Sequence, residues 1–150
     1  RYPWFRADTP QPFCPNGPAQ SFEAAYQPFE KGYMLWFDDR IWAVWGGSGA
    51  IYPDSWAGGD VVFDETPPEG RLQPVRGFGT LWVSDANVRQ MLGWATAPEQ
   101  AYTLQYQETA LIHRAGLRGG YMASDVIISL PDGALLQITR TGDHFSPRQP

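Results

Sequence analysis

The chain has 150 residues, of which 43% are hydrophobic and 18% are charged, with 16 glycines and 14 prolines. This length supports one ordinary domain, and the composition is too apolar for a disordered chain and too rich in turn formers for a helical bundle. No apolar run approaches the ~20 residues that span a bilayer, so we expect no membrane insertion. The net charge of −5 leaves no basic stripe for a phosphate backbone, which argues against a nucleic-acid partner.

Few residues of this chain suit catalysis or metal binding. The one cysteine, Cys14, excludes an internal disulfide and a cysteine-based zinc site. The two histidines, His113 and His144, lack HExxH-like spacing, and no strand is followed by a phosphate-binding glycine motif. We therefore predict no catalytic residues, no metal site and no cofactor.

The first third of the chain predicts an arm followed by a hairpin. Residues 1–20 are rich in proline and aromatic residues, which predicts an extended arm packed along another surface. From Tyr33 to Trp45 two β-rich runs flank the polar residues 38–40, and this pattern predicts a hairpin. Both faces of each run are apolar, so the hairpin is either covered on both sides or offers one face to a partner.

The middle of the chain predicts a loop, a strand and a helix. Residues 60–70 are acidic and contain two adjacent prolines, which indicates an exposed loop with 61–63 tucked along one side. Residues 77–83 predict a strand. Ser84 is the expected N-cap of a short helix near 85–92, because the apolar residues that follow recur on one helical face and a glycine comes after them.

The last third of the chain predicts strands. They are expected over 102–112, 126–130 and 134–139, with a Pro-Asp-Gly turn at 131–133. The predicted organisation is an arm over 1–20, a single β-rich domain over 21–142 and a frayed tail over 143–150.

An internal repeat supports this fold class. Gln-Pro, six residues and Leu-Trp occur at 27–36 and again at 73–82, a period of 46 residues. Such a period predicts supersecondary units, here about 27–45 and 73–83, that bury their apolar faces on each other. The expected fold is all-β or β-dominated, with repeated β-hairpin units in a propeller-like or barrel-like arrangement and one short helix near 85–92.

Two segments carry a resemblance to a known family. The first runs from Phe29 to Trp36 and continues through 41–44, 49–51 and Trp56, and the second is Leu92–Glu99. They resemble the Phe-Glu-Gly-Gly, Gly-Ala-Ile and Leu-Gly-Phe-Pro parts of the LGFP repeat of bacterial cell-envelope and secreted proteins, over about 60 of the 150 residues. The resemblance implies an extracellular β-rich module, repeats around a pseudo-symmetry axis, and a role in holding proteins at the cell wall.

Aromatic residues make up 15% of the chain, a surplus that either core packing or a binding surface must explain. Sugar rings stack on aromatic faces while polar side chains bond their hydroxyls, so tryptophans beside small polar residues suit a glycan site. We predict Trp42, Trp45 and Trp56 as binding residues, with core packing as the open alternative for each. Trp36 and Trp82 recur in the repeat, which favours a core role.

Asp38 and Asp39, at the tip of the predicted hairpin, complete the candidate binding site. With Glu30 or Glu99 they could also form the paired carboxylates of a glycosidase. Adjacent aspartates at a hairpin tip are more often turn formers, and Glu30 could instead pair with Arg40 or Arg76.

These observations favour a non-catalytic extracellular module over an enzyme. It would be secreted or associated with the cell envelope, with a cell-wall polysaccharide or an envelope protein as its partner. The alternative is a structural subunit of a surface layer, filament or larger envelope complex, because a hairpin with two apolar faces and a proline-rich arm suit packing in a homo- or hetero-oligomer.

Overall fold

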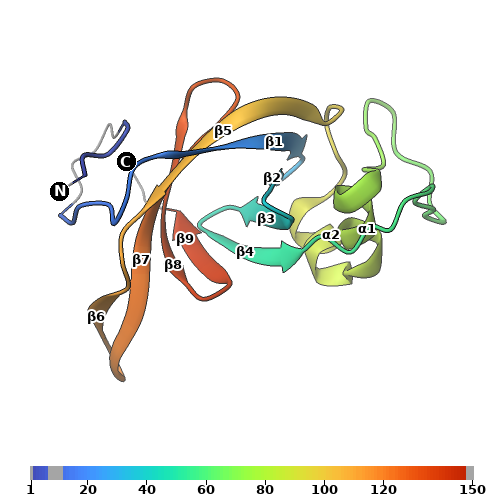
Figure 1. The fold of residues 1–150 in the computed structure, drawn as a ribbon. Helices are drawn as coiled ribbons and strands as arrows, with labels where there is room; N and C mark the ends of the chain where they lie inside the picture. The colour runs from blue at the N-terminus through green and yellow to red at the C-terminus, as the bar shows by residue number, and fades with distance from the viewer. Residues whose placement is uncertain (1, 7–11, 148–150) are drawn as a thin grey trace. The chain divides into compact units, whose positions relative to one another are not determined.

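The computed structural model describes residues 2–6 and 12–147 (Figure 1). These residues form nine strands and two short helices, which confirms the prediction of a β-dominated fold. The chain forms two compact units: a central unit, Glu23–Tyr102, and a terminal unit that joins the residues up to Phe22 to those from Thr103 onward. None of the helices in the described part of the chain is long and apolar enough to cross a membrane.

The central unit is built on an antiparallel meander in which each strand pairs with the next along the chain. Its strands are β1 (Gln20–Phe29), β2 (Gly32–Phe37), β3 (Arg40–Trp45) and β4 (Ser48–Pro53). The hairpin predicted over 33–45 is therefore present as β2 and β3. Asp38 and Asp39 join these strands with φ angles of 51° and 57°, the left-handed backbone of a tight two-residue turn.

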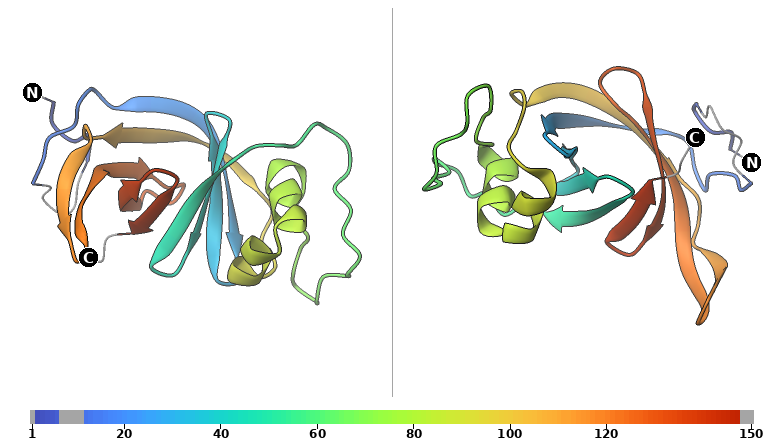
Figure 2. Two further views of the ribbon diagram at one scale, coloured as in Figure 1. Left: turned by 90° about the horizontal axis from the view of Figure 1, so that it is seen from below. Right: turned by 180° about the vertical axis from the view of Figure 1, so that it is seen from behind.

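One face of this meander packs against α1 (Arg76–Ser84) and α2 (Ala86–Leu92), and Figure 2 shows both helices on the same side of β2, β3 and β4. The strands contribute alternate residues to this core, as the period of a β-strand requires. The buried members are Phe29, Met34, Ile41, Ala43, Phe78, Leu81, Trp82, Val88, Leu92 and Ala95.

The opposite face of the hairpin is also buried. Its alternate residues Leu35, Phe37, Trp42 and Val44 are all in the core. The sequence predicted a hairpin that is either covered on both faces or offers one face to a partner, and the structure shows that both faces are covered. No open apolar face remains on β2 and β3.

The strand predicted over 77–83 is wrong, because this segment forms α1. Phe78, Leu81 and Trp82 stand at helical spacing and are buried together on one face. Gly77 and Gly79 let the helix approach its neighbours closely, since a Cβ on Gly79 would overlap the carbonyl oxygen of Pro74. The run of apolar and small residues has strand-like composition, but its buried side chains recur with a period near 3.6.

The helix predicted near 85–92 is present as α2, but its expected N-cap is wrong. Asp85, not Ser84, accepts hydrogen bonds from the backbone N–H groups of Asn87 and Val88, at 3.0 and 3.2 Å. The Ser84 hydroxyl instead donates to the carbonyl of Leu81 in the last turn of α1.

The 46-residue repeat does not correspond to a repeated structural unit. Its first copy lies on β1 and β2, and its second lies on a loop and α1. On the strand, Leu35 and Trp36 point to opposite faces of the sheet, whereas on the helix Leu81 and Trp82 are buried together. The same dipeptide therefore meets two different packing requirements.

The terminal unit is organised around β7, which pairs antiparallel with the end of β5, with β6 and with β8, while β8 also pairs with β9. The strands are β5 (Gln100–Glu108), β6 (Ile112–Gly116), β7 (Gly119–Ser129), β8 (Leu135–Thr141) and β9 (His144–Pro147). The predicted turn at 131–133 is present, since the Asp132 carboxylate accepts from the N–H of Ala134 and Gly133 has a φ of 86°. The strand expected over 102–112 is interrupted between β5 and β6.

The two chain ends differ from the prediction in one respect. The tail does not fray over His144–Pro147, because these residues pair with β8 and the ring of Phe145 is buried. The arm packs along the terminal unit, where it is held by the buried side chain of Gln107 on β5. This side chain donates to the carbonyls of Pro3 and Gly17 and accepts from the N–H of Phe5, at 2.6–3.0 Å. Arm residues 1 and 7–11 and tail residues 148–150 lie outside the described residues.

Candidate functional site

The predicted site residues have very different environments. Trp42 is 3% exposed and its ring stacks on that of Phe37 at 5.3 Å, so it belongs to the core. Trp45 is half-buried and packs against the core between the meander and the helices α1 and α2. Asp38 and Asp39 are exposed turn residues, which agrees with their interpretation as turn formers.

Trp56 is the exposed tryptophan among the three predicted binding residues, with 38% of its surface accessible. Its position is fixed at two points, because the indole Nε1–H donates to the carbonyl of Gly59 and the backbone N–H donates to Oδ1 of Asp54, both at 3.1 Å. The second oxygen of Asp54, Oδ2, accepts from the indole of Trp36 at 2.9 Å. One carboxylate therefore holds both tryptophans. We call Trp36, Asp54, Trp56 and the glycines 58–59 the Trp56 site.

The local sequence explains why this arrangement forms. Asp54 is the first residue after β4, and the chain then turns back through Gly58 and Gly59, whose φ angles of 94° and 84° favour glycine. A Cβ on Gly77 would lie 2.7 Å from Oδ1 of Asp54, so glycine there leaves room for the carboxylate. The start of a helix carries partial positive charge, which favours a carboxylate beside the first turn of α1.

The Trp56 site carries groups that suit ligand binding. An exposed indole face can stack on an apolar sugar face, and a carboxylate with two bonded oxygens retains lone pairs for a hydroxyl donor. Gly58 and Gly59 add backbone groups without side chains that would crowd a ligand. The site residues therefore offer stacking and hydrogen bonding.

An aromatic cluster that was not predicted from the sequence joins α1 to the chain segments before and after the two helices. The rings of Phe63, Trp82 and Trp94 meet at centroid distances of 4.8–5.9 Å, and the Arg89 guanidinium lies 4.9 Å from the Phe63 ring. Arg89 also donates to the carbonyls of Trp82 and Val83 at the end of α1, at 2.9–3.0 Å. This is a structural role, because the guanidinium satisfies carbonyls that a helix end leaves unpaired.

Glu30 is engaged in structure, not in a carboxylate pair. Its Oε1 accepts from the backbone N–H of Trp94 at 2.7 Å, and its Oε2 lies 3.3 Å from Nε of Arg71. The predicted alternative partners, Arg40 and Arg76, are thus replaced by Arg71. The hydrogen bond from Trp94 and then the nearby Arg71 lower the pKa of Glu30, whereas burial raises the pKa of Glu99.

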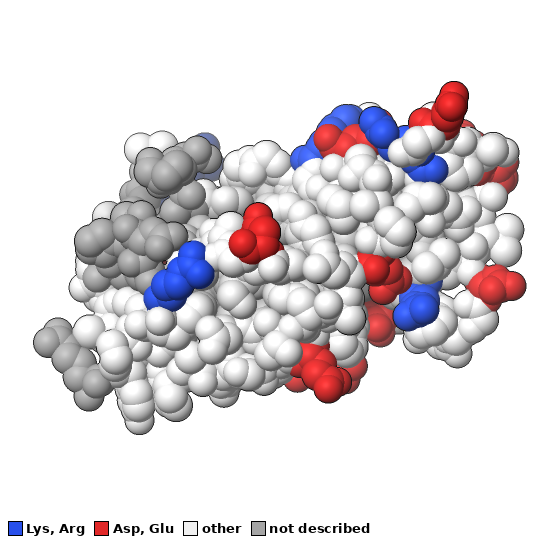
Figure 3. Space-filling view, turned by 90° about the horizontal axis from the view of Figure 1, so that it is seen from above, with Lys and Arg blue, Asp and Glu red and all other residues white. Residues whose placement is uncertain are grey.

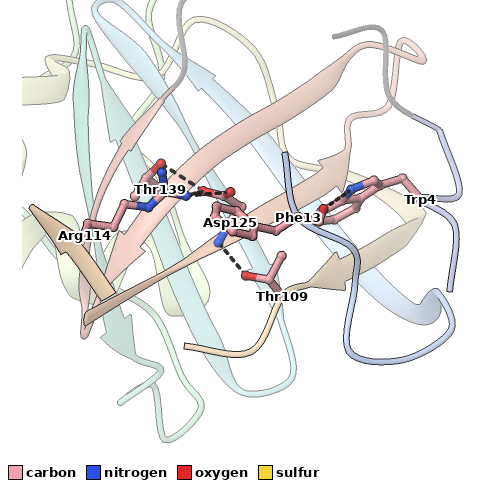
Figure 4. Close-up of polar contacts among 6 residues, drawn as sticks. All are labelled: Trp4, Phe13, Thr109, Arg114, Asp125 and Thr139. Carbon is pink, nitrogen blue, oxygen red and sulfur yellow. Dashed lines mark hydrogen bonds and ion pairs between the residues drawn. The ribbon is translucent and has the colours of Figure 1, made fainter. Parts of the chain in front are cut away.

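The terminal unit holds a buried ionic cluster, shown in Figure 4. Both carboxylate oxygens of Asp125, whose side chain is 1% exposed, accept from Nη2 of Arg114 at 2.7 and 2.8 Å. Thr139 donates to the same carboxylate at 3.2 Å, and the Asp125 N–H donates to the hydroxyl of Thr109. The Arg114 guanidinium also lies 5.5 Å from the ring of Phe13. These contacts tie β6, β7, β8 and the arm together.

In the part of the chain that the structure describes, no group of three or more His, Cys, Asp or Glu residues could hold a metal ion. Charged side chains on the face in Figure 3 lie in small separate groups among uncharged residues. No protein-family model, curated protein or solved structure matches this chain.

Proposed function

We propose that this chain is a non-catalytic extracellular module that binds a glycan of the bacterial cell envelope, with Trp56 as the stacking residue. The observation that carries this proposal is an exposed indole fixed at two points beside a carboxylate. A ring that is already ordered loses little conformational freedom when a ligand stacks on it, which favours affinity.

The resemblance to LGFP repeats supports an envelope location. Its two segments lie side by side, because the N–H groups of Glu30 and Lys31 donate to the carbonyls of Trp94 and Leu92, both at 2.9 Å. Gly32 lies in the first of these segments and is required there by packing, since a Cβ would overlap the carbonyl oxygen of Val44. The segments 29–36 and 92–99, which resemble the repeat, are thus hydrogen-bonded neighbours in the central unit.

A sedimentation assay with purified bacterial cell walls tests the proposal. The wild type should sediment with the walls, and Trp56→Ala should bind about 5- to 150-fold more weakly, the range for loss of about 1–3 kcal/mol at a binding hot spot. Tyr2→Ala is the matched control, because Tyr2 is also an exposed aromatic residue but belongs to the terminal unit.

Both variants should keep the thermal midpoint of the wild type, since neither side chain is in the core. The proposal is wrong if the wild type does not bind walls, or if Trp56→Ala and Tyr2→Ala bind equally well. Replacing Trp42 would not serve as a test, because its loss would unfold the core.

The alternative function, a structural subunit of an envelope assembly, has a separate observation in its favour. In the terminal unit, Leu111 just before β6, Leu117 at the tip of the β6–β7 hairpin, and Tyr121 and Met122 on β7 are exposed. A hairpin with several exposed apolar side chains suits a protein interaction site.

A further inference from the structure

The β6–β7 hairpin is an apolar and basic projection of the terminal unit. Figures 1 and 2 show it extending beyond the ends of β8 and β9. Leu117, at its tip, is fully exposed, and the neighbouring residue is Arg118. Residues 111–124 contain two arginines and no aspartate or glutamate, although the whole chain has a net charge of −5. Since Arg114 bonds Asp125, Arg118 is the basic group displayed at the tip.

The loop that follows β4 has the opposite charge. Residues 41–70 contain no lysine, arginine or histidine, and the loop carries Asp60, Asp64 and Glu65, which are all exposed. Val62 stands among these carboxylates with 80% of its surface accessible. We call residues 60–65, which include these carboxylates and Val62, the acidic loop.

The exposure of Val62 is imposed by its neighbours. The ring of Phe63 packs on Trp82 and Trp94, and the carbonyl of Val61 accepts from the Gln73 side chain at 2.8 Å. With the residues on both sides anchored inward, Val62 is presented outward on an ordered backbone. An ordered apolar side chain loses less freedom when it is covered than one on a free loop would.

We infer that copies of this chain associate head to tail, with the β6–β7 tip of one copy docked on the acidic loop of the next. Leu117 would cover Val62, and Arg118 would face Asp60, Asp64 and Glu65. An apolar centre within a rim of opposite charges is the usual anatomy of a protein interface. Because the two surfaces differ, a pair of copies in contact still has one tip and one acidic loop unoccupied. Further copies can bind there, and the contact builds a ring or an open filament.

An anionic membrane is the other partner that an apolar tip with an arginine could meet. The charge distribution favours a second copy, because the acidic loop supplies several carboxylates for one arginine, while a net charge of −5 would be repelled by anionic lipid. The inference does not involve Trp56, so it stands or falls separately from glycan binding.

Sedimentation velocity over a range of protein concentrations, at low and high salt, tests this assembly. The wild type should form species larger than a monomer, and high salt should weaken them. Arg118→Glu and the double variant Asp64→Lys with Glu65→Lys should each raise the dissociation constant at least tenfold. Arg40→Glu makes the same charge change as Arg118→Glu at an exposed position, the first residue of β3, and should associate like the wild type.

Mixing the two charge-reversed proteins is the decisive experiment. Each contact between unlike copies then pairs opposite charges again, so the mixture should associate although neither component does alone. A wild type that stays monomeric at all concentrations, or a mixture that shows no recovery, overturns the inference. A third outcome also overturns it. In that outcome neither the wild type nor the acidic-loop variant self-associates, and both bind phosphatidylglycerol vesicles.

Discussion

Loss of Arg114 should destabilise the terminal unit more than loss of any other arginine on its surface. Arg114→Ala removes both short hydrogen bonds from the guanidinium to Asp125 and leaves a 1% exposed carboxylate without its positively charged partner. Removing one partner of a buried ion pair costs about 3–5 kcal/mol, because the remaining charge stays buried after its opposite charge is lost. That is a large part of the ~5–15 kcal/mol that stabilises an ordinary domain.

A double-mutant cycle with Asp125→Asn separates charge burial from packing. The amide keeps the volume of Asp125 and one acceptor oxygen but carries no charge, so adding Arg114→Ala to the Asp125→Asn variant should cost only about 1 kcal/mol. The cation–π contact of Arg114 with Phe13 is lost in both backgrounds and cancels in the cycle. The coupling free energy should therefore be about 2–4 kcal/mol.

Urea denaturation followed by tryptophan fluorescence measures these free energies. Arg118→Ala is the control on the same hairpin and should change stability by no more than about 0.5 kcal/mol. The reasoning is refuted if Arg114→Ala costs the same in both backgrounds, since its effect would then be packing and not the buried charge.

Three further predictions concern the central unit. Trp82→Ala should cost about 3–5 kcal/mol in urea denaturation, because the buried ring and its hydrogen bond to the Gly93 carbonyl at 2.7 Å are lost, whereas the exposed Val62→Ala should change little. Gly32→Ala should cost about 1–3 kcal/mol or prevent folding, while Gly47→Ala, where a Cβ meets nothing within 4 Å, should be neutral. Because its pKa is lowered on folding, Glu30 contributes stability that is complete above its ordinary pKa of 4.5 and is lost as the pH falls through the lower folded value. The stability difference between wild type and Glu30→Gln should therefore shrink in acid, and a difference that grows would contradict the assignment.

Local patterns in the sequence were enough to predict the elements that depend on local residues. The β2–β3 hairpin follows from two β-rich runs around Asp38 and Asp39, and α2 follows from apolar residues at helical spacing before a glycine. The Pro-Asp-Gly turn before β8 was predictable for the same reason, because its geometry is set by the turn residues themselves.

Elements that depend on distant contacts were not predictable. The segment that forms α1 has strand-like composition, and its helical state is stabilised by packing of Phe78 and Trp82 beneath the meander. β9 is a short strand in a proline-containing tail, and it is held by pairing with β8 and by burial of Phe145. The N-cap at Asp85 shows the same limit, since Ser84 and Asp85 are equally good capping residues in sequence.

Recurrence in the sequence did not separate buried from exposed tryptophans. Trp82 recurs and is buried, but the unrepeated Trp42 is buried as well, while the recurring Trp36 is half-buried at the edge of the Trp56 site. What separates them is the element that carries each one. Trp42 lies on a central strand whose two faces are both covered, so its ring has no route to solvent. Trp56 lies just beyond a strand end, where a carboxylate and two left-handed glycines hold the chain in a turn that leaves the residue 38% exposed. Trp56 is therefore fixed by hydrogen bonds and not by burial, which is why it is the tryptophan that we propose for ligand stacking.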